Sequence, residues 1–210
     1  MTLILTCICK DGVCVCADKR NTKKYSDGRV ERKDILNKIY KFRDVAIIIF
    51  NHGINEINGR AWDSYCSVYE ASRDWERLTF RGIVGDFQKF IERDVKVELS
   101  RNKRNRLDNL IAFVLCGKTS KDNRFEAGEL CWSPLLATKF QGNFIRSGEG
   151  AKYLVGILRD NPELDTSEYW KNRNTAEGRE KLRWIFLQAV GLKNKCNGQE
   201  FSDQFDLEVI

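Results

Sequence analysis

The chain is poor in the residues that interrupt or link folded segments. Its 210 residues include only two prolines and 15 glycines, with 42% hydrophobic and 31% charged residues, a composition typical of a globular protein without a long linker. No apolar run approaches the ~18 residues of a membrane helix. The start of the chain also lacks the charged stretch and cleavage site of a secretory signal. We therefore expect one domain, residues 1–210, in the cytoplasm.

Histidine is the scarcest catalytic residue type. His52 is the only histidine, and no serine, cysteine or aspartate pattern surrounds it, so a triad built on histidine is not expected. His52 precedes Gly53 and is interpreted either as a residue lining a substrate pocket or as a structural side chain. The chemistry must therefore come from other residue types.

Cysteine, by contrast, is plentiful, with eight residues that we expect to be reduced thiols in the absence of an export signal. Four of them flank a predicted turn at Asp11-Gly12, which would place Cys9 opposite Cys14 and Cys7 opposite Cys16 on one face of a hairpin. Zinc is the alternative to core packing for these four. Residues two apart on a flat strand lie about 6.6–7 Å apart, whereas zinc sites favour closely spaced sulfurs. We expect core packing, with no metal and no cofactor.

The formal net charge is +6, and basic residues cluster at 19–43 and 101–106. Such clusters are typical either of an anionic partner or of solvated loops. No aromatic residues alternate with the basic ones, as they do in single-strand nucleic-acid platforms. We interpret both clusters as loops and expect neither a nucleic-acid nor a membrane partner.

Hydrophobic periodicity predicts strands in runs and helices in pairs, an order that favours antiparallel sheets with helices outside them, in the α+β class. A polar loop is expected at 20–35, and the two helices after the fourth strand begin at Ile54 and Phe80. The predicted strands are 2–9, 13–19, 37–42, 45–50, 108–117, 125–132, 136–145 and 205–210, and the other helices are 149–159 and 176–190.

The beginning of the chain suggests a nucleophile. Thr2 follows Met1 directly, and methionine aminopeptidases remove Met1 when the next side chain is small. The exposed threonine would then carry a hydroxyl nucleophile and an amine base on one residue, a known way of activating threonine.

Several motifs follow Thr2 in order: Ala17-Asp18-x-Arg20, Asn37-Lys38-Ile39, Phe50-Asn-His-Gly53, Ile145-Arg-Ser147-Gly148 and a terminal Asp-Leu-Glu-Val-Ile. In this order and nearly end to end, the chain resembles a proteasome β-type subunit of the N-terminal nucleophile hydrolase superfamily. The resemblance implies a four-layer αββα sandwich, in which two antiparallel sheets lie between helical layers.

The resemblance also implies roles for individual residues. Thr2 would attack a peptide carbonyl, Lys38 would lower the pKa of the threonine amine and polarise its hydroxyl, and Asp18 would hold Lys38 charged. The backbone N–H of Gly53 would bind the oxyanion. The implied catalytic set is Thr2, Asp18, Lys38, Gly53, Ser147 and Gly148, the last two supporting the amine.

The last loop departs from the pattern of such subunits. Lys193 stands where they have an aspartate, and Cys196 where they have a serine, so a second cation replaces an acid that helps to hold the amine. The expected function is a threonine hydrolase that cleaves peptide or isopeptide bonds in a peptide or protein substrate. A transpeptidase or ligase with an acyl-Thr2 intermediate, and a non-catalytic assembly or binding protein, stay open as alternatives.

Relatives with this fold form rings, so the resemblance also implies a homo-oligomer. An interface between rings needs apolar residues on outward helix faces. We expect the helices at 54–75 and 80–98 to supply Trp62, Phe90 and Val95.

Overall fold

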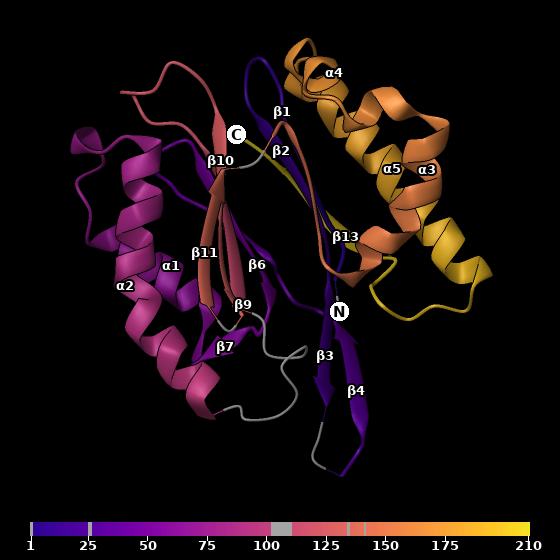
Figure 1. Cartoon of the computed structure of the whole chain (residues 1–210), viewed down its shortest axis with the longest axis horizontal. Coiled ribbons are helices and arrows are strands. Elements are labelled where there is room, and N and C mark those ends of the chain that lie inside the picture. Colours follow the sequence, from indigo (N-terminus) through magenta and orange to yellow (C-terminus); the bar gives the residue numbers. More distant parts are fainter. Residues whose placement is uncertain (1, 25–26, 102–110, 134, 141) are drawn as a thin grey trace. The chain divides into compact units, whose positions relative to one another are not determined.

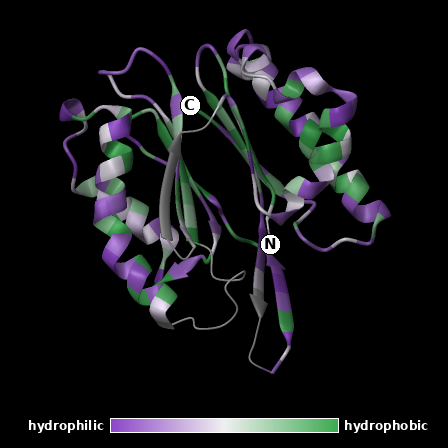
Figure 2. Cartoon of the chain, viewed as in Figure 1, coloured by the Kyte–Doolittle hydropathy of each residue, from purple (hydrophilic) through white to green (hydrophobic). Residues whose placement is uncertain are grey.

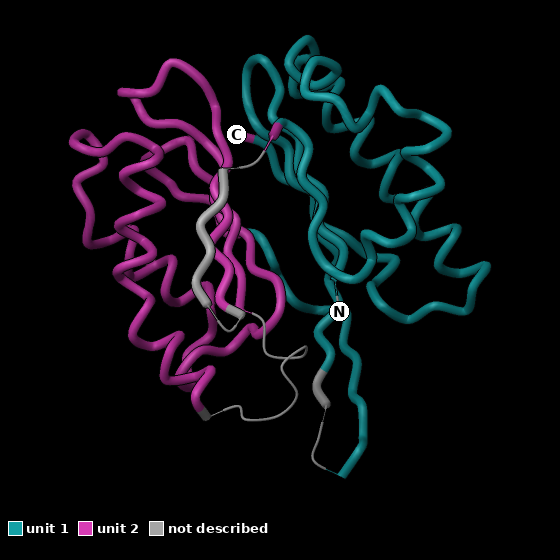
Figure 3. Tube along the Cα trace, in the orientation of Figure 1, with its two compact units in different colours: residues 1–39, 143–209 teal, residues 40–142, 210 magenta. Residues whose placement is uncertain are grey.

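The computed structural model describes residues 2–24, 27–101, 111–133, 135–140 and 142–210. The chain divides into two compact units, each with its own sheet and helices (Figure 3). Unit 1 contains residues 1–39 and 143–209, and unit 2 contains residues 40–142 and 210. Among the described residues, no helix is both long enough and apolar enough to cross a membrane.

Unit 1 is built on a four-stranded antiparallel sheet in the order β12-β1-β2-β13. Its strands are β1 (Ile4–Ile8), β2 (Val13–Asp18), β12 (Phe144–Ser147) and β13 (Phe205–Val209). Every residue of β1 and β2 is buried, as their continuous apolar runs predict. The sheet places both ends of its central hairpin beside segments from the far end of the chain.

The hairpin between β1 and β2 turns one residue earlier than predicted, which shifts the cross-strand pairing by two residues. Cys9 N–H donates to Gly12 O at 2.8 Å, so Lys10 and Asp11 are the central residues of the turn. Cys7 therefore lies opposite Cys14, and the predicted pairing of Cys9 with Cys14 is wrong. The cysteines still share one face, because a shift of two residues preserves the side of the sheet.

Helices cover one face of this sheet in unit 1 (Figure 1). The longest, α5 (Thr175–Lys195), begins with a capping box formed by Asn174 and Glu177, which satisfies free backbone N–H groups at its first turn. Leu182, Ile185 and Phe186 face the sheet and are fully buried. The remaining helical segments of the unit are η2 (Glu149–Tyr153), α3 (Leu154–Asp160), η3 (Pro162–Asp165) and α4 (Ser167–Lys171).

Residues 20–35 do not form the predicted loop. They form a two-stranded antiparallel ribbon of β3 (Arg20–Lys24) and β4 (Val30–Asp34), which is mostly hydrophilic (Figure 2). Arg20 pairs with Asp34 at the base of the ribbon, and Gly28 has a φ of +86° between the strands. With charged residues on both faces, the sequence carries no apolar alternation that would reveal these strands.

Unit 2 contains a five-stranded sheet in the order β11-β10-β9-β6-β5. Its strands are β5 (Ile39–Lys41), β6 (Ile47–Gly53), β9 (Ile111–Gly117), β10 (Glu126–Ser133) and β11 (Leu135–Phe140). The predicted strand at 136–145 is therefore two strands, β11 and β12. Positions 108–110 of the predicted strand 108–117, and 102–106 of the second basic cluster, lie outside the described residues.

The helices of unit 2 are α1 (Trp62–Ala71), η1 (Trp75–Arg77) and α2 (Phe80–Arg101). The first begins later than predicted, because residues 54–61 contain a small hairpin of β7 (Glu56–Ile57) and β8 (Arg60–Ala61). Asn58 and Gly59 both have positive φ between these strands, as a type I′ Asn-Gly turn requires.

The aromatic core of unit 2 contradicts the predicted interface residues. Trp62 and Val95 are 1% and 0% exposed and pack among core residues of the unit, and Phe90 packs against the same core. These side chains stabilise the unit and do not form an outward apolar patch. Antiparallel sheets accompanied by helices confirm the α+β class.

Candidate active site

Thr2 lies just before β1, where several backbone contacts hold it. Gly150 N–H donates to Thr2 O at 2.9 Å, and Ile4 pairs with Ala17 on one side and with Ser147 on the other. These contacts hold Thr2, a buried residue, in one place next to the ends of two strands.

Gly148 packs directly on Thr2. Its φ is +88° with ψ 169°, a region that residues other than glycine rarely adopt. A Cβ there would lie 2.3 Å from Thr2 O and 2.4 Å from Thr2 Cγ2. The glycine therefore allows the backbone to approach Thr2 closely, and this contact depends on its missing side chain.

Asp18 is the hub of the site. Its side chain is fully buried, and its Oδ1 accepts from Thr2 Oγ1 at 2.6 Å, from Leu3 N at 2.7 Å and from Lys38 Nζ at 2.8 Å. Its Oδ2 accepts from Arg20 N at 2.9 Å and from Ser202 N at 3.2 Å. Five donors on two oxygens suit a carboxylate, which accepts at both oxygens and donates at neither.

Lys38 completes the pairing around the Thr2 hydroxyl. Its side chain is 3% exposed, and Nζ donates to Thr2 Oγ1 as well as to Asp18. Burial lowers the pKa of Lys38, and the charge of Asp18 opposes this shift only in part. The hydroxyl thus donates to a carboxylate and accepts from an ammonium group that releases its proton more readily than a lysine in water.

The base of the ribbon supports the same site. Arg20 Nε and Nη2 each donate to Asp34 at 2.8 Å, and these bonds hold the pKa of Asp34 below its usual range. Because Arg20 N–H also donates to Asp18, the ribbon fixes one edge of the carboxylate. Sequence reasoning missed Asp34, for which the only signal is its spacing from Arg20 in a polar hairpin.

Lys193 was expected to be a second cation near the Thr2 amine, but in the structure its ammonium group is bonded to other residues. It is buried, and Nζ donates to Phe201 O at 2.9 Å and to Asp203 Oδ1. Partial burial raises the pKa of Asp203, but the hydrogen bonds from Lys193 and Asn194, together with the nearby positive charges, outweigh it and the pKa is lowered. The positive charge of Lys193 is thus paired with the carboxylate of Asp203. Its two bonds hold the segment from Phe201 to Asp203, which includes Ser202, whose N–H donates to Asp18.

The remaining predicted residues are placed as follows. Ser147 is buried at the end of β12, and Cys196 is an exposed thiol at the C-terminal cap of α5. Gly53 ends β6 with a φ of +94° and belongs to unit 2, as does His52, whose Nε2 lies 3.4 Å from Glu129 Oε1. The structure thus brings together Thr2, Asp18, Lys38, Ser147 and Gly148 within unit 1, and their catalytic roles stay predictions.

Comparison with known proteins identifies a fold. No family model matches the chain, and no curated protein matches it either. Solved structures of Anbu, the ancestral beta-subunit, are similar. Anbu from Yersinia bercovieri has a TM-score of 0.65 and 9% identity, covering 99% of this chain and 80% of that one. A helical assembly of the Anbu complex from Pseudomonas aeruginosa has a TM-score of 0.63 and 12% identity, covering 99% of this chain and 80% of that one. A Gly-1 mutant of Anbu from Hyphomicrobium sp. strain MC1 has a TM-score of 0.61 and 13% identity, covering 100% of this chain and 82% of that one.

These findings correct the assignment made from sequence motifs. The chain is not shown to be a proteasome β-type subunit of the N-terminal nucleophile hydrolase superfamily, because no family model or curated protein supports it and its structural neighbours are Anbu proteins at 9–13% identity. At such identity the likeness shows a proteasome-like fold alone. Short motifs such as Ser147-Gly148 also serve backbone geometry, and a fold does not by itself carry an activity.

Proposed function

We propose that this chain is a threonine hydrolase that cleaves peptide or isopeptide bonds through Thr2 once Met1 is removed. The observation that carries the proposal is the Thr2 hydroxyl, hydrogen-bonded to both Asp18 and Lys38 in a buried site. A structural threonine needs one partner for its hydroxyl. Burying a carboxylate and an ammonium group around it costs desolvation energy, which is typical of a site kept for chemistry.

The reaction follows from the groups on Thr2 and around it. The free α-amine of Thr2 takes the proton from Oγ1 as the oxygen attacks the substrate carbonyl carbon. The C–N bond of the tetrahedral intermediate then breaks, and the leaving nitrogen takes that proton. The acyl group stays on Oγ1 as an ester until water, deprotonated by the same amine, releases the acid and restores Thr2.

Lys38 and Asp18 adjust this chemistry electrostatically. A cation at the hydroxyl oxygen favours the alkoxide that develops during attack and lowers the pKa of a nearby amine, so that the amine is more often an unprotonated base. Asp18 orients Lys38 and compensates its charge. The N–H of Gly53 is assigned to the oxyanion, where one preorganised donor contributes about 3 kcal/mol, and Ser147 and Gly148 are assigned to support of the amine.

The broader organisation is part of the same proposal. We place residues 1–210 in one domain with a four-layer αββα arrangement, acting as a homo-oligomer in the cytoplasm. The helical assembly of Anbu from Pseudomonas aeruginosa supports self-association. Light scattering at micromolar concentration tests it, and a mass near the 24.4 kDa of one chain would contradict it.

Peptide cleavage by matched variants tests the function. The intact mass should lack Met1, and a library of fluorogenic peptides and isopeptides should reveal turnover. Thr2→Val keeps the shape of the side chain but lacks the hydroxyl, and should lose turnover. Thr2→Ser should retain part of it. Cys196→Ser, which removes an exposed thiol, should cleave as the wild type does.

The alternatives are outcomes of the same experiment. A ligase would give more amide product than acid when a primary amine competes with water for the acyl-enzyme. A chain that keeps Met1 and turns over no substrate would refute the catalytic proposal and favour an assembly or binding role. Cleavage that persists in Thr2→Val would place the chemistry elsewhere.

A further inference from the structure

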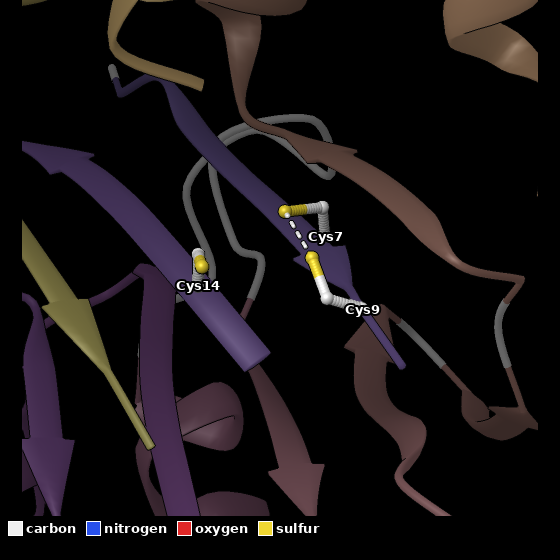
Figure 4. Close-up of side chains that lie close together, drawn as sticks. All are labelled: Cys7, Cys9 and Cys14. Carbon is white, nitrogen blue, oxygen red and sulfur yellow. Dashed lines mark hydrogen bonds between the residues drawn. The ribbon is translucent and has the colours of Figure 1, made fainter. Parts of the chain in front are cut away.

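Three buried cysteines lie together at the turn end of the β1–β2 hairpin (Figure 4). Cys7 Sγ and Cys9 Sγ are 3.7 Å apart, and the sulfurs of Cys7, Cys9 and Cys14 all lie within 4.8 Å of one another. Among the described residues, this is the one group of three or more potential metal ligands with such spacing. The cluster belongs to unit 1 and plays no part in the proposed hydrolysis.

The separation of about 6.6–7 Å expected between residues two apart on a flat strand does not apply to the sulfurs of Cys7 and Cys9. Cys9 lies just beyond the end of β1, in the turn closed by its N–H bond to Gly12. A flat strand therefore does not fix its side chain, and its sulfur comes close to that of Cys7. For metal–sulfur bonds of about 2.3 Å, three sulfurs around one ion lie about 4.0 Å apart, close to the observed separation.

The first turn of α5 leaves room above these sulfurs. Gly178 packs against the cluster, and a Cβ there would lie 2.5 Å from Cys9 Sγ and 3.1 Å from Cys7 Sγ. Cys14 Sγ donates to Thr175 O at 3.2 Å, from the same turn. Any side chain at position 178 would fill the space that the three sulfurs occupy.

Charges near the turn favour a bound cation. Two carboxylates lie in these segments: Asp11 in the turn accepts a hydrogen bond of 2.8 Å from Thr175 N–H, and Glu177 lies in the first turn of α5. Lys10 and Asp11 are exposed, so solvent reaches the turn directly above the buried cluster.

We propose that Cys7, Cys9 and Cys14 form a binding site for a thiophilic d10 metal ion, and for Cu(I) in particular. Soft thiolate ligands select Cu(I), zinc and iron–sulfur clusters among the first-row metals. Structural zinc takes four ligands, whereas no further His, Cys, Asp or Glu of the described residues joins these three sulfurs. Each thiol that becomes a thiolate ligand releases its proton on binding.

A bound ion would join the two strands of the hairpin, because Cys7 and Cys9 come from β1 and the turn after it and Cys14 comes from β2. The same two strands have Thr2 and Asp18 at their opposite end, so the metal would stabilise the scaffold of the candidate active site without touching its reacting groups. Metal binding to the folded chain alone raises its apparent stability. The site is independent of whether Thr2 is a nucleophile.

Anaerobic titration of the reduced, full-length chain with Cu(I), against bicinchoninate as a competing chelator, tests the site. We expect one Cu(I) per chain, three sulfur neighbours in X-ray absorption, and a higher melting temperature. Cys9→Ala should weaken binding at least tenfold. Cys16→Ala is the matched control, because Cys16 is equally buried on the same face but lies outside the cluster, and it should bind as the wild type does.

Glycine variants test the geometry without removing a sulfur. Gly178→Ala should weaken binding, whereas Gly191→Ala on the same helix, where a Cβ would meet nothing within 4 Å, should not. The proposal is overturned if the chain does not compete with bicinchoninate, or if Cys9→Ala and Cys16→Ala bind equally. Zn(II) titrated in parallel should bind more weakly than Cu(I), and the reverse order would contradict the choice of ion.

Discussion

Replacing Asp18 by asparagine tests the charge arrangement at the candidate site. Asp18→Asn keeps the shape of the side chain but turns one oxygen into an NH2 group, a donor. With the amide oxygen at the Oδ1 position, the new donor faces the N–H groups of Arg20 and Ser202. In the opposite orientation it faces three donors, including Lys38. Both orientations leave buried donors without an acceptor.

The cost follows from the groups left unpaired. Each buried donor without an acceptor costs about 1–3 kcal/mol, and removing one member of a buried ion pair costs about 3–5 kcal/mol. Since such terms overlap, we expect Asp18→Asn to lower the free energy of unfolding by about 4–6 kcal/mol, using the ranges for unsatisfied donors and broken ion pairs. That is a large part of the stability of a typical domain.

A double-mutant cycle separates the ion pair from the other contacts. Lys38→Met alone should cost about 2–3 kcal/mol, below the range for a fully unpaired charge, because Asp18 keeps four other donors. In the double variant neither charge remains. Its loss should therefore be smaller than the sum of the two single losses by about 2–3 kcal/mol, within the range seen for residues in direct contact.

Urea unfolding of the wild type, the two single variants and the double variant measures this coupling. The same stabilising osmolyte is added to all four, so that the destabilised variants are folded at the start of the titration. The ion pair of Glu92 and Lys96 on the surface of α2 is the control. Its coupling energy should be about 0.3–0.5 kcal/mol, the value typical of ion pairs four residues apart on a helix. Losses for Asp18 and Lys38 that add to within about 0.5 kcal/mol would refute a buried ion pair at this site.

Other predictions concern the same unit. Gly148→Ala should lower the free energy of unfolding by at least about 3 kcal/mol, the upper end of the cost of backbone strain. Gly156→Ala in α3, where a Cβ would meet nothing within 4 Å, should instead raise it by up to about 1 kcal/mol. The urea midpoints of the two variants check this. Lys193→Met should lower the free energy of unfolding by about 1–3 kcal/mol, because it leaves a buried carbonyl without its donor, and Asp203→Asn should cost less, because Asp203 is half exposed. Since the pKa of Lys38 is lowered from 10.5, the unfolded chain binds more protons than the folded chain between the two pKa values, and the free energy of unfolding should rise with pH there. Urea denaturation at several pH values measures this rise, and an equal rise in Lys38→Met would contradict the prediction.

The sequence was sufficient where a strong periodicity had a single interpretation. The hairpin of β1 and β2, the long helices α2 and α5 and the last strand follow from apolar patterns, which burial in one core preserves. The ribbon at 20–34 was missed, because its strands carry charges on both faces and are held by pairs such as Arg20 with Asp34. The start of α1 was placed too early, because the Asn58-Gly59 turn was not recognised within an apparently helical pattern.

The candidate site was only partly readable for a similar reason. The motifs named Thr2, Asp18 and Lys38, and the structure places them in contact. The groups that hold Asp18 from the far end of the chain are backbone donors such as Ser202 N–H, which leave no mark on the sequence. Lys193 was interpreted as a second cation near the amine, because its partner Asp203 lies ten residues away across a loop that periodicity does not describe.

The central claim is that Thr2 is a nucleophile, and the site of covalent labelling tests it most directly. The native chain should be treated with a peptide epoxyketone or β-lactone and its N-terminal fragment sequenced by tandem mass spectrometry. The account predicts a single adduct on Thr2 of a chain that lacks Met1, absent in Thr2→Val and in urea-unfolded protein. An adduct on Cys196 or another residue, or labelling that persists in Thr2→Val, would contradict it.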